Sequence, residues 1–509
     1  MLPFTFPNNT NSLWHETTKL PTYPTLEENL EVDITIVGGG ITGITLAYLL
    51  RQEGYSICLI DANRFLSGTT GNTTAKITVQ HGLIYDELIN NFDLDTAKLY
   101  YEANERALQF MKKTIEENKI DANFTTAPSF LYSTEGDNTE KLEKELAAYE
   151  AIGIQGTLTT KTELPFQVRQ ALKIENQAHF HPLHYLTYLL EECNKAGVKL
   201  YENTRALSIE YSKRPIVICK DDYRIVSHYV VQTSHYPIFD GEQFFPLKMY
   251  ADRSYALAAK TKTTVDGMYI NIDTPTRSIR PVTIDGDQGM LFAGENHRTG
   301  VSDHPMAEHF NQLASFAEKN FTIETIDYQW SDQDYTTADK LPYIGTMTAE
   351  KDNVFVATGF RKWGMTNGTN AALLLRNLII NKKCRFADLF SLQRKTKINP
   401  NLKNMFTFNA EVAKQLVKGK LDGEEGDISK LEKGKACTII KEGNRIGVYK
   451  DEEDQLYAVD TTCTHLGCEL NWNDAEKSWD CPCHGSRFSY EGKVLNGPAV
   501  RDLTRYKDL

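Results

Sequence analysis

The chain has 509 residues and a formal net charge of −12, and this length is enough for two or three domains. The acidic balance argues against a nucleic-acid partner and gives no reason to expect binding to anionic lipid, because both need a basic protein surface. No stretch approaches the roughly 18 apolar residues of a membrane helix, and residues 1–20 lack the cationic start and apolar run of a secretory signal.

The first strongly apolar run opens a strand–helix–strand unit. Residues 34–37 are predicted to form a buried parallel strand, and residues 57–60 a second strand. Residues 41–52 between them have the apolar spacing of a helix, which Gly54 ends. Such a unit is the start of an α/β fold with a parallel sheet.

The turn between this strand and this helix carries a nucleotide-binding pattern. Gly38, Gly40 and Gly43 form G-x-G-x-x-G, in which the glycines allow a tight turn, close approach of a pyrophosphate and helix–strand packing. Asp61 ends the second strand, eighteen residues after Gly43, near the distance expected of an acid that binds ribose hydroxyls. The pattern predicts a dinucleotide site. No second such unit follows a strand, which favours FAD over a pyridine-nucleotide–flavin reductase.

Several later segments resemble the D-amino-acid oxidase/glycine oxidase family of flavoproteins, over about residues 12–390. They are residues 67–74, 280–294, 330–345 and 354–366. No residue clearly marks a covalent attachment site, so noncovalent FAD is expected. The resemblance implies FAD contacts by two groups of residues. The first group is Thr69, Thr70 and Gly71, and the second is Gly359, Gly364 and Thr366. It also implies a helix near residues 370–380 whose start points at the flavin.

The intervening chain fits an inserted substrate domain. Residues 93–118 and 139–151 are predicted to be charged amphipathic helices with solvated faces, and residues 182–195 another helix. Residues 245–300 have β-type composition with turns at Asp266-Gly267 and Asp285-Gly286. We therefore expect a Rossmann-type FAD domain with an inserted mixed-sheet substrate domain over residues 1–395. A linker with a helix near residues 409–418 would occupy residues 396–426.

Four residues are candidates for contact with the substrate. A carboxylate substrate needs a guanidinium fork, for which Arg280 is the first choice, because the resemblance places it on the cavity strand, and Arg361 the second. Surface ion pairing is the alternative for both. His81 either sits above the flavin or caps a turn, and Tyr335 either borders the cavity or packs in the core.

Other polar residues receive simpler interpretations. Lys76 is interpreted as a surface lysine rather than a flavin contact. His179, His181 and His297 are interpreted as structural or exposed.

The last fifty residues carry the most specific spacing. Cys463-x-His465 and Cys481-x-x-His484 supply two thiolates and two imidazoles, which suit a [2Fe–2S] cluster with two Cys on one iron and two His on the other. A zinc site is the alternative for such a quartet. Zinc would explain neither the two further cysteines of these boxes nor the nearby serine and proline.

These boxes resemble the Rieske family over residues 425–509, so a small all-β Rieske domain is expected at residues 427–509. The resemblance implies that Cys463, His465, Cys481 and His484 are the cluster ligands. It also implies a disulfide between Cys468 and Cys483, a cluster-shielding loop at Gly497-Pro498, and a hydrogen bond from Ser486 to a cluster sulfur. Phe488 replaces a family tyrosine, so one hydrogen bond is missing and the cluster potential is expected to lie below the top of the Rieske range.

Together these features predict a cytoplasmic FAD-dependent dehydrogenase. It would oxidise a small amine, amino acid or related acid and pass electrons one at a time from reduced FAD through the cluster to an unknown acceptor. Five cysteines scattered outside the cluster boxes suit a reducing compartment. The alternatives are an NAD(P)H-dependent Rieske-type reductase, a Rieske oxygenase, which would need a further iron site, and a non-catalytic redox-sensing module.

Overall fold

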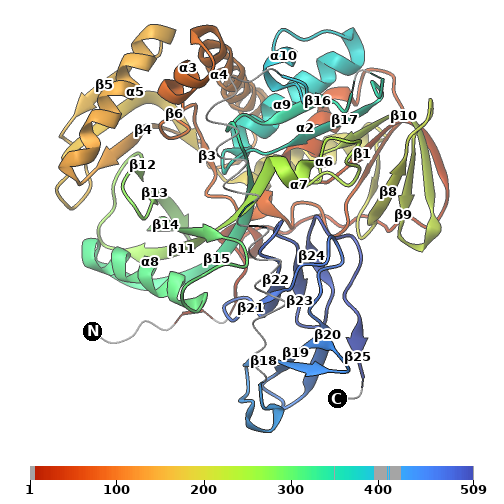
Figure 1. The fold of residues 1–509 in the computed structure, drawn as a ribbon. Coiled ribbons are helices and arrows are strands. Elements are labelled where there is room, and N and C mark those ends of the chain that lie inside the picture. The colour runs from red at the N-terminus through yellow and green to blue at the C-terminus, as the bar shows by residue number, and fades with distance from the viewer. Residues whose placement is uncertain are drawn as a thin grey trace.

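A computed structural model describes residues 6–7, 9–348, 350–394, 410, 412 and 426–507. Two large sheets, each covered by helices, form the first part of the chain, and two small sheets form the C-terminal part (Figure 1). The fold class expected from the sequence is confirmed. The predicted linker helix lies almost wholly outside the described residues. Within the described ranges, no helix is long and apolar enough to cross a lipid bilayer.

The first sheet is the nucleotide-binding sheet. Its strand order is β16-β17-β10-β1-β2-β7, with a β8–β9 hairpin continuing from β10. The pairs among β17, β10, β1, β2 and β7 are parallel, and β16 is antiparallel. The strands are β1 (Leu30–Val37), β2 (Ile57–Ile60), β7 (Lys199–Tyr201), β8 (Ala206–Glu210), β9 (Ile216–Cys219), β10 (Arg224–Gln232), β16 (Tyr343–Thr346) and β17 (Val354–Thr358).

The second sheet is mixed and corresponds to the substrate domain. Its order is β15-β11-β14-β13-β12-β4-β6-β3, with β5 beside β6, and only β12 and β4 pair in parallel. The strands are β3 (Lys76–Ile77), β4 (Thr125–Ser133), β5 (Gly156–Thr159), β6 (Gln170–His179), β11 (Met249–Thr261), β12 (Met268–Asn271), β13 (Arg277–Ile284), β14 (Asp287–Arg298) and β15 (Ile323–Thr337). Both turns predicted in this region are present, and Gly267 and Gly286 adopt the positive φ that they require.

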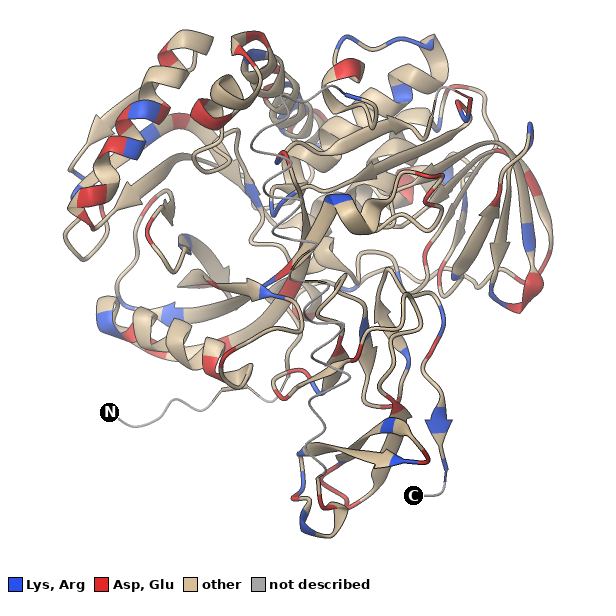
Figure 2. Ribbon diagram, viewed as in Figure 1, with Lys and Arg blue, Asp and Glu red and all other residues tan. Residues whose placement is uncertain are grey.

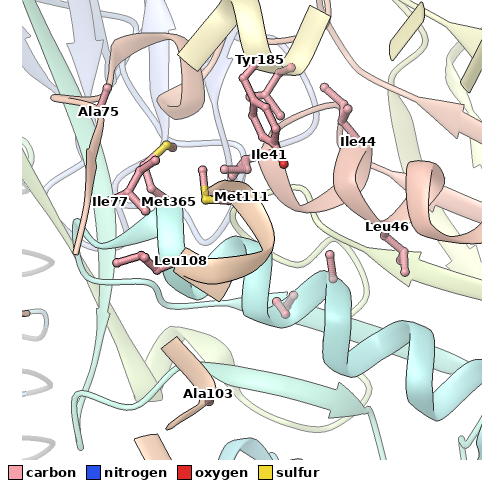
Figure 3. Packing of buried hydrophobic residues seen from close by; sticks show 14 of the residues in the cluster. Ile41, Ile44, Leu46, Ala75, Ile77, Ala103, Leu108, Met111, Tyr185 and Met365 are labelled. Carbon is pink, nitrogen blue, oxygen red and sulfur yellow. The ribbon is translucent and has the colours of Figure 1, made fainter. Parts of the chain in front are cut away.

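Ten α-helices are described. They are α1 (Leu13–Glu16), α2 (Ile41–Leu50), α3 (Tyr85–Asn91), α4 (Leu94–Glu117), α5 (Thr139–Ile152), α6 (Pro182–Lys195), α7 (Phe245–Lys248), α8 (Ala307–Asn320), α9 (Gly364–Asn381) and α10 (Ala387–Phe390). The main core lies where α2, α4, α6, α9 and β3 meet (Figure 3). Ile41 and Met365, at the starts of α2 and α9, belong to this core, so packing fixes both helix starts.

Two helix predictions need correction. The helix expected at residues 370–380 begins earlier, at Gly364. Its first residues are poor helix formers, but they pack tightly, since a Cβ on Gly368 would lie 2.8 Å from Thr42 Oγ1. Helix α4 is not merely a solvated element, because one of its faces is buried and includes Tyr100 and Leu108. Charged side chains of both signs remain on the outer helices (Figure 2).

The C-terminal part contains two small antiparallel sheets. One has the order β18-β19-β20-β25 and the other β21-β22-β23-β24. The strands are β18 (Ala436–Lys441), β19 (Asn444–Lys450), β20 (Leu456–Asp460), β21 (Asn471–Asn473), β22 (Ser478–Asp480), β23 (Arg487–Ser489), β24 (Val494–Asn496) and β25 (Arg505–Tyr506). The sheet with β21–β24 lies against the large domains, and the sheet with β18–β20 projects away from them (Figure 1).

A buried ion-pair network joins this part to the second sheet. Arg253 of β11 contacts Glu476 at 2.5 Å, and Arg487 of β23 contacts the same carboxylate at 3.0 Å. Burial opposes the charge of Glu476, yet the two guanidinium groups lower its pKa below the ordinary value. Nε and Nη1 of Arg253 have no hydrogen-bond partner among the described residues. The buried positive charge of Arg253 is therefore stabilised mainly by Glu476.

We expect Glu476→Gln to lower the free energy of unfolding by about 3–5 kcal/mol, because it leaves the buried Arg253 without a counter-charge and Arg487 with Asp480 alone. Urea denaturation of the cofactor-loaded protein measures this change. Glu491→Gln is the matched control in the same domain, since Glu491 makes only peripheral pairs with Lys493 and Arg505. Equal stability of the two variants would contradict the assignment.

Candidate functional site

A cavity of about 970 Å³ lies between the two large sheets and reaches the C-terminal part. This volume is at the upper end of the range for small-molecule and cofactor sites. Its lining includes the glycine turn at residues 38–42, the inner face of the second sheet, the start of α9, and residues 495–500. One cavity therefore contacts all three parts of the fold.

The glycine turn has the geometry expected of a nucleotide cradle. Gly38 has φ +115°, and a Cβ there would lie 2.5 Å from Thr233 O. A Cβ on Gly43 would lie 2.0 Å from Gly38 O, so α2 can approach the turn this closely only without a side chain. The resulting space in front of the start of α2 suits a pyrophosphate.

Asp61 closes the nucleotide end of the cavity. Its Oδ2 accepts a hydrogen bond from Gly39 N at 2.7 Å, and its Oδ1 accepts one from Asn63 N at 2.8 Å. Burial raises the pKa of Asp61 to about 6, although these two N–H donors act in the opposite direction. Each oxygen retains a lone pair, so the carboxylate could still accept hydrogen bonds from ribose hydroxyls, and this role stays a prediction.

Three of the other six predicted FAD residues line the cavity. Thr69 and Thr70 line it, and Thr70 Oγ1 accepts a hydrogen bond from Ile41 N at 3.0 Å. Gly364 lines it at the start of α9. Gly71 adjoins this wall. Gly359 and Thr366 are not among the cavity-lining residues. Thr366 Oγ1 bonds to His81, which does line the cavity, and a Cβ on Gly359 would lie 2.5 Å from Thr337 Cγ2.

His81 and Arg361 are brought together at the cavity wall. Arg361 Nη2 donates to His81 O at 2.9 Å. The His81 ring is buried and stacks on Trp363, its Nδ1 lies 2.6 Å from Tyr100 Oη, and its Nε2 lies 2.8 Å from Thr78 O. Burial lowers its pKa to about 3, so it is a neutral, fully hydrogen-bonded ring. This arrangement favours positioning over proton transfer.

Arg280 occupies a different place from the one expected. It is 1% exposed but is not among the cavity-lining residues, and it donates to Thr74 O at 2.6 Å and Pro281 O at 2.8 Å. The side chain at the cavity is instead Lys76, which is 8% exposed and not on the surface as interpreted. Its Nζ donates to Ser278 Oγ. Burial, together with the charge of Arg280, lowers the pKa of Lys76 to about 7.

The other histidines singled out from the sequence are structural. His179 pairs with Arg280 and His181 caps the start of α6. His297 contacts Tyr255 and stacks on His309.

Several cavity residues were not predicted. His235 follows the carboxyl end of β10, and its imidazole lies 3.0 Å from Asp334 Oδ1 and 3.2 Å from Thr69 Oγ1. Asp332 lies beside the same Thr69 hydroxyl at 3.3 Å, and burial raises its pKa to about 6. The available signal was topological, because side chains that follow parallel strands face the ligand crevice of an α/β sheet.

The four predicted cluster ligands converge in the C-terminal part. The rings of His465 and His484 lie 5.2 Å apart, and their Nδ1 atoms are buried and have no partner among the described residues. Burial lowers the pKa of both to about 4, so both are neutral. A hydrogen bond from Cys481 and backbone N–H groups lower the pKa of the Cys463 thiol to about 7. Two orphaned imidazole nitrogens and two free thiols fit a [2Fe–2S] cluster.

The remaining features of the boxes agree with the Rieske resemblance. Cys468 and Cys483 form a disulfide, as expected. They lie close to Cys481, but the disulfide removes both as metal ligands. Ser486 Oγ accepts a hydrogen bond from Ala499 N at 3.0 Å and contacts the Cys463 thiol.

Comparisons with known proteins decide the family. The FAD dependent oxidoreductase family model matches residues 33–378, and the Rieske [2Fe-2S] domain model matches residues 424–507. The chain belongs to the FAD-dependent oxidoreductase family and carries a Rieske domain. It is 44% identical over 491 residues to a Bacillus subtilis protein named "Putative Rieske 2Fe-2S iron-sulfur protein YhfW", with 96% of both chains covered. FAD and a [2Fe–2S] cluster are therefore its cofactors.

Solved structures agree on the fold of this FAD-dependent oxidoreductase. Glycine oxidase from Geobacillus kaustophilus superposes with a TM-score of 0.58 at 18% identity, covering 72% of this chain and all of that one. L-Proline dehydrogenase from P. horikoshii gives 0.59 at 18% identity, covering 72% of this chain and 98% of that one. At this identity the likeness concerns the fold alone.

The Rieske domain of this oxidoreductase supports a prediction about its potential. Phe488 is fully buried beside the cluster loops and has no hydroxyl to donate to the cluster. Ser486 is then the side-chain donor available from this segment. We expect a midpoint potential below about +300 mV, and Phe488→Tyr should raise it by restoring a donor. An anaerobic redox titration followed by EPR measures both values, and a wild-type potential near +300 mV would contradict the prediction.

Proposed function

We propose that this protein is a dehydrogenase for a small amine, amino acid or related acid, with electrons leaving through the Rieske cluster to a one-electron acceptor. Bound FAD supplies two-electron oxidation of a C–H bond, and the cluster supplies one-electron transfer. Gly38, Gly40, Gly43 and Asp61 would hold the dinucleotide. Cys463, His465, Cys481 and His484 would hold the cluster. This division of labour explains why one chain carries both centres.

One observation carries the proposal. Residues 495–500, which belong to the Rieske domain, line the same cavity as the glycine turn of the FAD site. The Rieske loops are also bonded to that wall, since Tyr335 Oη donates to Gly497 O at 2.8 Å. A substrate oxidised in this cavity would therefore give up its electrons next to the one-electron centre.

The substrate end of the cavity is cationic. Lys76 has no carboxylate within salt-bridge distance among the described residues, and it contacts only a hydroxyl, that of Ser278. A buried ammonium without a counter-charge is costly, so an anionic substrate group would stabilise it. Arg361 also lines this cavity and directs one guanidinium nitrogen at a neutral carbonyl. We propose Lys76, assisted by Arg361, as the carboxylate anchor in place of Arg280.

The cellular setting follows from the cysteines. Cys58, Cys193, Cys219, Cys384 and Cys437 are free thiols. We propose a reducing compartment such as the cytoplasm, where unpaired thiols persist, with the Rieske disulfide as a local exception.

Anaerobic mixing tests the proposed function. The protein is mixed separately with NADH and with a panel of amines, amino acids and hydroxy acids, while flavin bleaching is followed optically and cluster reduction by low-temperature EPR. We expect an amine or acid to bleach the flavin and a reduced-cluster signal to follow. Reduction by NADH alone would show a reductase instead. A flavin that no small molecule reduces would show a redox-sensing module.

A further inference from the structure

Strand β15 is a wall with the FAD cavity on one side and the Rieske loops on the other. Asp332 and Asp334 point to the cavity side, where they contact Thr69 and His235. Gln333 and Tyr335 alternate with them along the strand. Both also line the cavity, and their side chains donate hydrogen bonds to the Rieske loops. Both are at least 98% buried.

Gln333 and Tyr335 hold two separate loops of the Rieske domain. Gln333 Nε2 donates to Gly485 O at 2.8 Å, and its Oε1 accepts from Thr299 Oγ1 at 2.8 Å, which fixes the amide. Tyr335 Oη donates to Gly497 O at 2.8 Å and lies 3.4 Å from His484 O. The first loop carries the predicted ligands Cys481 and His484.

The approach of the two domains at this point is close. Gly485 has φ +78°, and a Cβ there would lie 2.4 Å from Ala251 Cβ and 2.9 Å from Gln333 Nε2. The contact therefore tolerates no side chain at Gly485 and little change of angle between β15 and the loop.

Packed rings continue the contact toward the cluster. The ring centroids of His235 and Tyr335 lie 4.9 Å apart, those of Tyr335 and Tyr236 5.1 Å, and those of Tyr236 and His465 6.3 Å. At the cavity end, His235 Nδ1 lies 3.2 Å from Thr69 Oγ1. Electron tunnelling decays less steeply through packed and hydrogen-bonded atoms than across gaps, so this row is a short connection between the two centres.

We infer that Gln333 and Tyr335 are positioning residues that clamp the cluster-binding loops against the FAD cavity and thereby set the rate of electron transfer between the two centres. The inference rests on the proposed function for the direction of electron flow. It adds the two residues that hold the Rieske loops at a fixed position against the cavity, and it assigns them no chemical step.

Tyr335→Phe, in the full-length protein with both cofactors, tests the clamp. The change removes the hydroxyl and keeps the ring, and Gln333→Met provides a second variant. Tyr269→Phe is the matched control, because Tyr269 is also a buried tyrosine that donates to a backbone carbonyl, Asp266 O at 2.9 Å, but lies in the distal part of the second sheet. A light-activated deazaflavin injects electrons anaerobically, so no substrate is needed. The redistribution of electrons between flavin and cluster is followed by absorbance.

We expect redistribution to slow at least about tenfold in both clamp variants, because a displacement of about 1 Å at a reacting geometry has large effects on rate. Amide hydrogen exchange in peptides from residues 481–500 should become faster, while the EPR g-values stay those of an intact cluster. The Tyr269→Phe variant should match the wild type in the redistribution rate, in amide exchange and in the EPR g-values.

The outcomes separate the two proposals. Wild-type redistribution rates and unchanged amide exchange in Tyr335→Phe and Gln333→Met would overturn the clamp and leave the proposed function standing. Absence of any flavin-to-cluster redistribution in the wild type would overturn the relay in the proposed function. In that case unchanged amide exchange in the variants would overturn the clamp as well, and faster exchange would support it as a purely structural contact.

Discussion

Replacing Cys481 with alanine is expected to remove the [2Fe–2S] cluster completely while FAD stays bound. Cys481 is 1% exposed, contacts the Cys463 thiol and lies on the loop that also carries His484. Three protein ligands cannot complete the coordination of a Rieske centre. The FAD cavity keeps its glycine turn and Asp61, so flavin binding should not change.

The measurements are iron content, low-temperature EPR and flavin absorbance. We expect no iron–sulfur signal, normal flavin content, bleaching of the flavin by the substrate that reduces the wild type, and loss of electron delivery to a one-electron dye. Cys437→Ala is the control, because Cys437 is a free thiol of the same domain on β18, away from the cluster loops. A Cys481→Ala protein that retains the EPR signal would refute the ligand assignment.

Replacing Lys76 with methionine is expected to lower kcat/KM for a carboxylate-bearing substrate by about 10- to 100-fold. A hydrogen bond to a charged group contributes about 1.5–3 kcal/mol, and each 1.4 kcal/mol corresponds to a tenfold change. Methionine keeps the length of the side chain without its charge. Lys173→Met is the control, because Lys173 lies in the same sheet on β6 and pairs with Glu175.

The pH dependence of kcat/KM has a defined sign. The pKa of Lys76 is lowered to about 7 by burial and by Arg280, so the ammonium form is lost as pH rises through 7. We expect kcat/KM for an anionic substrate to fall above pH 7 in the wild type, and this limb to be missing in Lys76→Met. A limb that persists in the variant would assign the titration to another group.

The lowered pKa of Lys76 also makes the free energy of unfolding depend on pH, with the opposite sign to the pH dependence of kcat/KM. Between pH 7 and the ordinary lysine pKa, the unfolded chain holds a proton that the folded protein does not. The free energy of unfolding therefore rises with pH across this window. Burial of the charged Lys76 ammonium destabilises the folded protein to its full extent below pH 7. Lys76→Met should lack this dependence and fold at least as well as the wild type, which separates a substrate role from a folding defect.

Local patterns were sufficient for much of the fold. Residues 57–60 and 182–195 form the strand and helix predicted for them, because apolar runs, a proline at the helix start and a glycine after its end act over a few residues. The Cys468–Cys483 disulfide implied by the Rieske resemblance is also present. The FAD and cluster residues lie in such local motifs.

The substrate end required information that local patterns lack. In the second sheet β12, β4 and β6 lie between β3 and β13. Lys76 of β3 is buried because its Nζ nevertheless meets Ser278 of β13, about two hundred residues away in the chain. The family resemblance of its strand led us to expect Arg280 at the cavity. Its guanidinium instead donates hydrogen bonds to Thr74 O and Pro281 O. Which of two cations faces a ligand depends on such long-range packing. The roles of Lys76, Arg361, His81 and Tyr335 stay predictions.

The buried network of Arg253, Glu476 and Arg487 has a consequence for how the protein delivers electrons. Breaking a buried ion pair is costly, so we expect the Rieske domain to keep its position relative to the flavin during the proposed electron transfer. In the proposed function we would then expect the acceptor to approach the cluster on the side where Leu466 of the first cluster loop is 58% exposed. Turnover with a natural acceptor should follow the acceptor's concentration and diffusion, and the internal transfer step should be insensitive to solvent viscosity.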